Sequence, residues 1–82
     1  MVKMSVCEAV AKRMGGLLVE RDISLYRLAL ESGVLYETLK QIRANKNESV
    51  NLVTVIKIAG GFDMTLAEFV DDGMFHEDNL KF

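Results

Sequence analysis

The side chains with catalytic potential are few and lie far apart in this sequence. His76 is the only histidine and Cys7 the only cysteine, so together they cannot supply the number of ligands that zinc needs. The pairs Gly15–Gly16 and Gly60–Gly61 lack the preceding strand and following residues of a phosphate-binding loop. We therefore predict no catalytic residue, no metal site, no cofactor and no enzymatic activity.

A more informative spacing of polar residues lies just after position 35. On a helix with about 100° per residue, Leu35, Leu39 and Ile42 point inward. The residues that then point directly away are Glu37, Lys40, Gln41 and Ala44, with Tyr36 and Arg43 on one shoulder and Thr38 on the other. Side chains of these types form hydrogen bonds with base edges in nucleic acids.

The segment that positions these residues consists of two short helical repeats joined across one glycine. Apolar or small residues at i, i+3, i+4 and i+7 form one face of the first helix: Leu25, Leu28, Ala29 and Ser32. Gly33 then permits a left-handed turn before the second helix. Two helices joined by a turn of three or four residues that contains glycine are the helix-turn-helix signature of DNA-binding proteins. The small side chain of Ala29 suits a close helix crossing.

Capping residues predict where the other helices begin. Ser5 with Glu8 and Thr65 with Glu68 form capping boxes, while Ser24 and Asn51 are N-caps. The predicted helices span about 5–21, 24–32, 36–44, 51–60 and 65–73, and we expect no strands. Their apolar faces are Val6, Val10, Met14, Leu17 and Leu18 in the first helix, Leu52, Val55, Ile56 and Ala59 in the fourth, and Leu66, Phe69 and Val70 in the fifth.

Length and charge define the class of protein. The 82 residues suffice for a single domain over 1–82, with its core at about 5–72, and the lone cysteine suits a reducing cytosol. No apolar run approaches the roughly 20 residues of a membrane helix, so we expect a soluble cytoplasmic protein. Net charge is −2, but residues 1–62 carry +3 and residues 63–82 carry −5. A basic face can thus coexist with an acidic end.

The tail 74–82 either folds back on the domain, frays, or docks its aromatic residues on a second subunit.

A longer series of residues resembles one family. It comprises Arg13-Met14-x-x-Leu17-Leu18, Ile23-Ser24-x-x-x-Leu28-Ala29-x-x-Ser32-Gly33-Val34, Thr38-Leu39, and Leu52-x-x-Val55-x-Lys57-Ile58-Ala59-x-x-Phe62-x-x-x-Leu66-x-x-Phe69. Over about residues 10–72 this series resembles the phage-repressor-like helix-turn-helix family (Cro and repressor type, also called Xre). The resemblance implies an all-α, compact five-helix, lambda-repressor-like domain whose third helix reads the major groove, usually as a homodimer on an inverted repeat. The family often has serine or threonine where Leu35 stands, so we expect helix three to lack its usual N-cap.

In this family's docking, the start of the third helix meets base edges. The residues that we predict to read bases are Tyr36, Glu37, Lys40 and Gln41. Those that we predict to contact phosphates are Ser24, Thr38, Arg43, Asn45, Lys46 and Asn47. Glu37 has an alternative role, because it can pair with Lys40 three residues on.

Two functions remain open from the sequence. The first is a sequence-specific regulator, expected to be a homodimeric repressor, that binds double-stranded DNA. The second is a protein-interaction module, or an antitoxin-like protein, that binds a partner through its acidic C-terminal region or apolar tail. A basic patch around Lys40, Arg43 and Lys46 would favour DNA.

Overall fold

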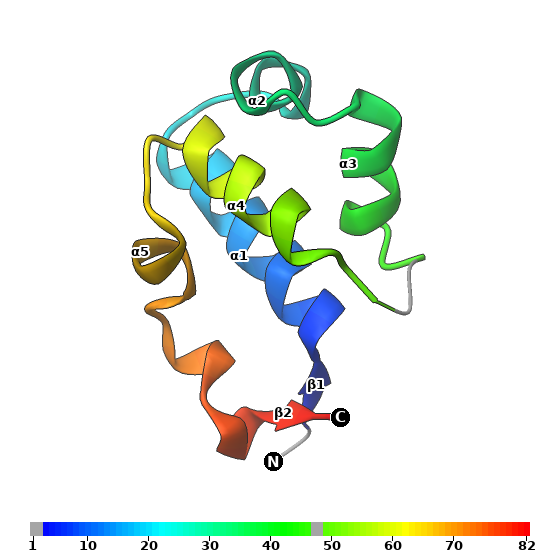
Figure 1. Ribbon diagram of the computed structural model, residues 1–82, viewed down its shortest axis with the longest axis vertical. Helices are drawn as coiled ribbons and strands as arrows, with labels where there is room; N and C mark the ends of the chain where they lie inside the picture. Colours follow the sequence, from blue (N-terminus) through cyan, green and yellow to red (C-terminus); the bar gives the residue numbers. More distant parts are fainter. Residues whose placement is uncertain (1–2, 47–48) are drawn as a thin grey trace.

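The computed structural model describes residues 3–46 and 49–82, and within them the chain folds into five α-helices. Two short 3-10 turns and a two-stranded parallel sheet complete the fold (Figure 1). The helices are α1 (Val6–Glu20), α2 (Leu25–Ser32), α3 (Tyr36–Arg43), α4 (Leu52–Gly61) and α5 (Leu66–Val70). The turns are η1 (Gly73–Phe75) and η2 (Glu77–Asn79), and the strands are β1 (Met4–Ser5) and β2 (Leu80–Lys81). The expected helical, five-helix architecture is confirmed.

The helices begin at the residues that their capping chemistry predicts. Ser5 and Thr65 each accept a hydrogen bond from the backbone N–H three residues on, and both capping boxes are complete. Ser24 caps α2 by accepting the N–H of Arg27, three residues on, and Asn51 caps α4 by accepting the N–H of Val53, two residues on. In α1, the helix continues through Gly15 and Gly16 without interruption. Helix starts are therefore encoded locally in this chain.

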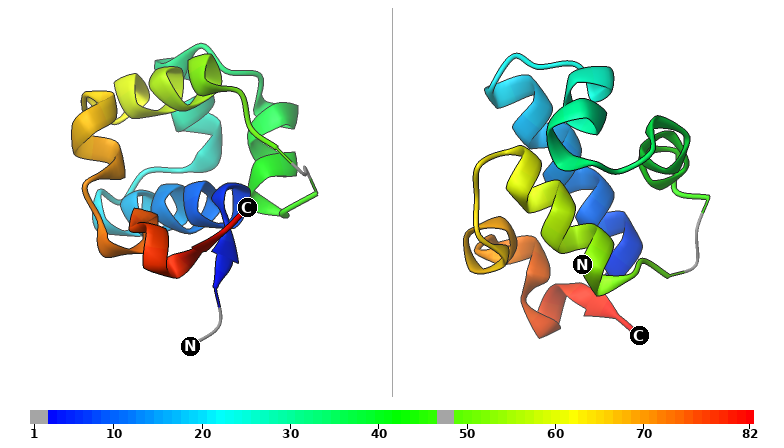
Figure 2. Two further views of the ribbon diagram at one scale, coloured as in Figure 1. Left: turned by 60° about the horizontal axis from the view of Figure 1, so that its bottom comes forward. Right: turned by 45° about the horizontal axis from the view of Figure 1, so that its top comes forward.

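The core is filled by side chains from all five helices, with α2 packed against α4 and α3 packed against α1 (Figure 1). The largest side chains that are fully buried come from all five helices and the turn after α4: Val10, Met14, Leu28, Leu39, Ile58, Phe62 and Phe69. Helix α3 packs against α1 and α2 and stands on the side of the molecule opposite α5 (Figures 1 and 2). This arrangement leaves the outer face of α3 free of the rest of the described chain.

Several residues that were predicted to face the core are exposed. In α4, Leu52 and Ile56 point to solvent, and the buried face is Val55, Ile58, Ala59 and Phe62. Val6, Leu35 and Val70 are exposed as well. The α4 prediction was right for Val55 and Ala59 and wrong for Leu52 and Ile56. This helix is apolar nearly all round, so two faces with the same i, i+3, i+4, i+7 spacing compete for the core.

The tail folds back on the domain, which is one of the alternatives left open by the sequence, but it does so through two short strands, and the prediction of no strands was wrong. Strand β2 pairs in parallel with β1, with Met4 opposite Leu80, so the tail returns to the start of α1 (Figure 2). Leu80 is buried, and the Phe75 ring lies 6.3 Å from that of Phe69. Helix α5 ends at Val70, before the predicted limit at 73, because the next residues turn into the extended chain that begins η1.

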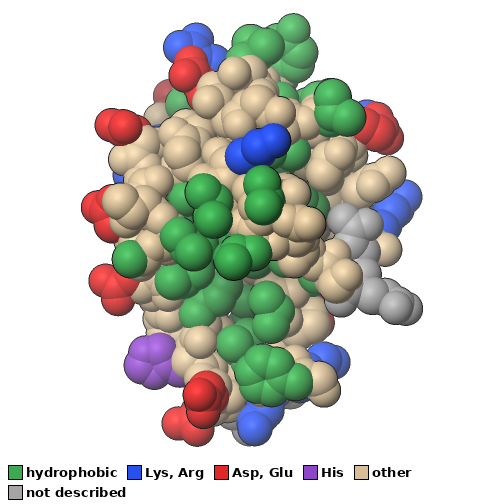
Figure 3. All heavy atoms as spheres, in the orientation of Figure 1, with side chains coloured by type: hydrophobic (Ala, Val, Ile, Leu, Met, Phe, Trp, Pro, Cys, Tyr) green, Lys and Arg blue, Asp and Glu red, His purple; other side chains and the backbone are tan. Residues whose placement is uncertain are grey.

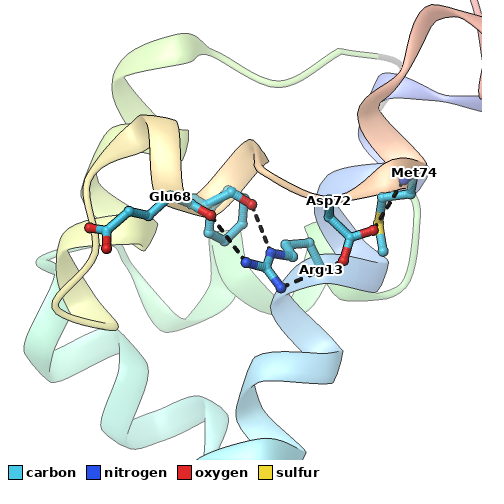
Figure 4. A network of polar contacts seen from close by, with 5 residues as sticks. Arg13, Glu68, Asp72 and Met74 are labelled. Carbon is cyan, nitrogen blue, oxygen red and sulfur yellow. Dashed lines mark hydrogen bonds and ion pairs between the residues drawn. The ribbon is translucent and has the colours of Figure 1, made fainter.

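Arg13 ties α1 to the end of α5. Its guanidinium donates to the Phe69 carbonyl oxygen at 2.7 Å and to that of Glu68 at 3.1 Å (Figure 4). It also lies 3.7 Å from the Asp72 carboxylate, which in turn accepts the Met74 N–H at the start of η1. One side chain thus satisfies two terminal carbonyls of a helix of five residues and anchors the turn that follows.

Replacing Arg13 by methionine is expected to lower the free energy of unfolding by roughly 1–2 kcal/mol. Methionine retains the apolar stem but leaves two carbonyls, the part-buried one of Phe69 and the exposed one of Glu68, without their charged donor. The matched control is Arg27→Met, which removes only an exposed pair with Glu31 at 2.8 Å and should cost less than about 0.5 kcal/mol. Urea denaturation of both variants checks this, and equal losses would contradict it.

Candidate nucleic-acid interface

The turn between α2 and α3 sets the direction of α3. Gly33 ends α2 with φ of 74°, and its N–H donates to the Ala29 carbonyl at 3.1 Å. The Ser32 hydroxyl then accepts the Val34 N–H at 3.2 Å, while the Val34 side chain enters the core. Leu35 follows at the N-cap of α3, where no hydrogen bond from its side chain caps the helix in the described structure. The predicted glycine turn and the missing N-cap are both confirmed.

Helix α3 divides into a buried and an exposed face. Leu39 and Ile42 are buried in the core, as predicted. Glu37, Lys40 and Gln41 are exposed on the other side. The charged and amide groups that can bond to base edges therefore all lie on the solvent side of a helix held by its neighbours.

The exposed face of α3 is slightly hollowed. A shallow depression of about 220 Å³ is lined by Glu37, Lys40, Gln41, Ala44 and Lys46. Three of the predicted base-reading residues thus share one surface with Lys46, a predicted phosphate contact. Tyr36, the fourth predicted reader, is exposed at the start of the helix.

Lys40 has two partners in the free protein. Its Nζ lies 3.0 Å from a Glu37 carboxylate oxygen and 5.0 Å from the centre of the Tyr36 ring. The Tyr36 ring in turn meets the Tyr26 ring edge-on, with centres 5.8 Å apart. Exposed ion pairs of this kind contribute about 0–1 kcal/mol, so Lys40 can exchange them for a nucleic-acid contact at small cost. The predicted pairing of Glu37 with Lys40 is present.

The predicted phosphate contacts fall into separate places. Arg43 and Asn45 face α1 rather than the depression, in a groove of about 340 Å³ whose other lining residues are Glu8, Ala11, Lys12 and Gly15. Asn45 has φ of 57°, the left-handed conformation expected at the end of α3. Lys12 lines the same groove as Arg43 and Asn45. The sequence did not predict this, because only the packing of α1 against α3 brings Lys12 there. Asn47 lies outside the described residues.

The two other predicted phosphate contacts, Ser24 and Thr38, lie away from both of these surfaces. The Ser24 hydroxyl accepts the Arg27 N–H at 3.0 Å as the N-cap of α2. Ser24 lines a separate groove of about 650 Å³. The two arginines in its lining are outnumbered by three acidic residues, Asp22, Glu31 and Asp63. Thr38 is half-buried on the flank of α3. Neither residue shares a surface with the α3 depression.

Acidic side chains gather away from α3. In Figure 3 most of the acidic side chains in view line the edge of the molecule over α5 and the tail, opposite the side on which α3 stands, and one lies on the α3 side. The two grooves beside α3 carry Lys40 and Lys46 against Glu37, and Lys12 and Arg43 against Glu8. Each is net basic, so the local charge favours an anionic partner although the chain is net acidic.

The candidate reactive groups do not converge. Within residues 3–46 and 49–82, no three His, Cys, Asp or Glu side chains lie close enough to hold a metal ion. Burial raises the pKa of the Cys7 thiol, which keeps it protonated at neutral pH. In the same part of the chain, no helix has the length and hydropathy needed to cross a membrane.

Comparison with known proteins agrees with this geometry. Residues 13–72, well over half of the chain, match the family described as the Cro/C1-type helix-turn-helix DNA-binding domain. The match runs from Arg13 in α1 to Asp72 after α5, so it includes all five helices at least in part. No match is found among curated proteins.

Proposed function

We propose that this chain, which belongs to the Cro/C1-type helix-turn-helix family of DNA-binding domains, is a homodimeric transcriptional repressor that inserts α3 into the major groove. Membership of the family means DNA binding and transcription regulation in general. The proposal that α3 enters the major groove rests on the exposed polar face of this helix. Leu39 and Ile42 are buried and hold α3 in place, while Glu37, Lys40 and Gln41 stay exposed.

Each exposed group of α3 has a matching base edge. Gln41 can form two hydrogen bonds with adenine, and Lys40 can donate to guanine O6 and N7. Glu37 can accept from cytosine N4 once Lys40 has turned to the DNA. Tyr36, at the first position of the helix, can touch a thymine methyl or a phosphate.

The phosphate backbone would be held on both sides of α3. Lys46 borders the α3 depression, and Arg43 with Asn45 borders the groove against α1. We add Lys12 to these phosphate contacts, since it lines the same groove as Arg43. Ser24 and Thr38 keep their predicted phosphate role only as more distant contacts.

An apolar face on α4 supports the homodimer. Leu52, Val53 and Ile56 are exposed along one side of the helix. A groove of about 220 Å³ beside them is lined by Val6, Val10, Val50, Leu52, Val55, Leu66, Val70 and Phe75. Figure 3 shows hydrophobic side chains gathered over this side of the molecule. We call Leu52, Val53, Ile56 and the groove the α4 face. Contiguous exposed apolar surface of this kind marks an interaction site.

A second copy of the chain fits this face better than other occupants. The molecule measures 34 × 24 × 22 Å. We propose that two copies docked through the α4 face set their α3 helices at the spacing of half-sites one turn of DNA apart, about 34 Å. A two-fold interface uses the same patch on both copies, and the exposed side chains at the centre of the α4 face are uncharged. Joining two copies thus brings no like charges together at the centre of the face, and the exposed Lys57 lies at its edge.

Replacing Lys40 and Arg43 together by alanine is expected to weaken DNA binding about tenfold or more, because one base contact and one phosphate contact are lost. Both side chains are exposed, so thermal melting should change little. The duplex is first obtained by selection from a random pool, in which an enriched inverted repeat reports specificity and two-fold pairing together.

The control for this prediction is Lys81→Ala, which removes an exposed charge from the tail, away from α3. Gel-shift titration at several salt concentrations compares the variants, and Arg43→Ala alone should reduce the salt slope by about two, one for each subunit of the proposed dimer. Unchanged binding in the double variant would remove α3 from the reading surface.

The second candidate, a protein-interaction module or antitoxin-like protein, uses the same fold differently. The exposed α4 face and the acidic tail are the features that favour it. It predicts that the random pool yields no enriched sequence, whereas the DNA proposal predicts an enriched inverted repeat.

A further inference from the structure

Leu35 is exposed at the leading edge of α3. The sequence pattern assigned it to the core, yet its side chain is 75% exposed. The reason is local: Val34 and Leu35 form a short extended link before the helix, and Val34 takes the inward position. A large apolar side chain is therefore held outward at the N-cap of α3, where it forms no cap of its own in the described structure.

The surroundings of Leu35 are also apolar. Tyr36 follows it as the first residue of α3 and is exposed. The exposed Tyr26 of α2 supports the Tyr36 ring through their edge-on contact at 5.8 Å. The polar face of α3 begins only at Glu37. The first part of the helix to meet a groove thus offers hydrocarbon and aromatic surface, whereas the next turn offers hydrogen-bonding groups.

The major groove contains one apolar group that matches this edge, the 5-methyl group of thymine. We propose that Leu35 packs against a thymine methyl at the base that faces the start of α3, and so makes the protein select thymine there. This inference rests on the proposed function, because it requires α3 to lie in the major groove. Leu35 then acts as a specificity residue through contact with the methyl group rather than by hydrogen bonding.

Deoxyuridine tests the methyl group directly, since it pairs like thymidine and lacks only that group. Each thymine of the selected half-site is replaced in turn by deoxyuridine, and the wild type and Leu35→Ala are titrated against every duplex. We expect one position where the replacement weakens wild-type binding by about threefold to tenfold. Leu35→Ala should weaken binding to the unmodified duplex by a similar factor, and should no longer distinguish thymine from uracil at that position.

The controls separate this inference from the proposal on which it rests. Leu30→Ala removes an equally apolar, exposed side chain from α2 and should keep the wild-type response to uracil. Thermal melting of Leu35→Ala should match that of the wild type, because the side chain is exposed. If selection enriches no sequence, the DNA-reading proposal itself fails. If a sequence is enriched but Leu35→Ala discriminates thymine from uracil at every position as the wild type does, or if the half-site lacks thymine, only the Leu35 inference is overturned.

Discussion

Ile56→Glu is expected to convert the protein from a dimer to a monomer and to weaken binding to the selected inverted repeat by about hundredfold or more. Ile56 lies in the middle of the exposed apolar side of α4, and 46% of its surface is exposed. A glutamate there is solvated in the monomer, but a two-fold interface would bury it against its own copy. Two like charges would then be desolvated together, which is strongly unfavourable. Each half-site would be bound separately, without the gain in effective concentration that linkage provides.

Two further variants separate the interface from the effect of charge on DNA binding. Val19→Glu introduces the same charge at an apolar position of α1 that is 80% exposed and outside the α4 face. It should leave the protein dimeric. Ile56→Lys adds a positive charge, which on its own would favour DNA, yet it should also produce monomers and weaken binding. Sedimentation equilibrium and gel-shift titration are the measurements. A monomeric wild type would contradict the homodimer, and a dimeric Ile56→Glu would move the interface away from the α4 face.

The local features of this fold are readable from the sequence. Ser5, Ser24, Asn51 and Thr65 begin their helices where capping predicts, because a cap depends only on residues two or three positions away. The left-handed turn at Gly33 follows from the same short-range geometry. The two faces of α3 were also predictable, since charged residues mark its outer side clearly.

The features that depend on tertiary contacts were not readable. In α4, apolar residues surround nearly the whole helix, and only packing against α2 and α5 decides that Ile58 is buried and Ile56 exposed. Strands β1 and β2 have two residues each, which is too short to show an alternation of apolar and polar side chains. The pairing of the tail with the segment before α1 could therefore not be predicted from the sequence. Lys12 of the candidate interface was also missed, because only the packing of α1 against α3 brings it beside Arg43. The exposed position of Leu35 was missed because Leu35 was counted as the first residue of the inward-facing repeat with Leu39 and Ile42.

Gly60→Ala and Gly61→Ala are expected to change stability in opposite directions although the residues are adjacent in α4. A Cβ added at Gly60 would have no described atom within 4 Å apart from its own helix and chain neighbours. Alanine there should raise the free energy of unfolding by about 0.5–1 kcal/mol, because it is the better helix former. A Cβ at Gly61 would instead lie 2.8 Å from Leu28 Cδ1 and 2.8 Å from Ser32 Cβ.

The contact at Gly61 is difficult to relieve because it involves backbone. The added Cβ would also lie 3.2 Å from the Ser32 Cα, so α2 itself would have to move away from α4. Overpacking of this kind typically costs about 1–3 kcal/mol, which predicts a difference of up to about 4 kcal/mol between the two variants in urea denaturation. Ser32 directly precedes the turn that orients α3, so Gly61→Ala should also weaken DNA binding at temperatures where it remains folded. Loss of stability with full DNA affinity would show that α2 adjusts without moving the recognition helix, and equal stability of the two variants would mean that no close α2–α4 crossing exists.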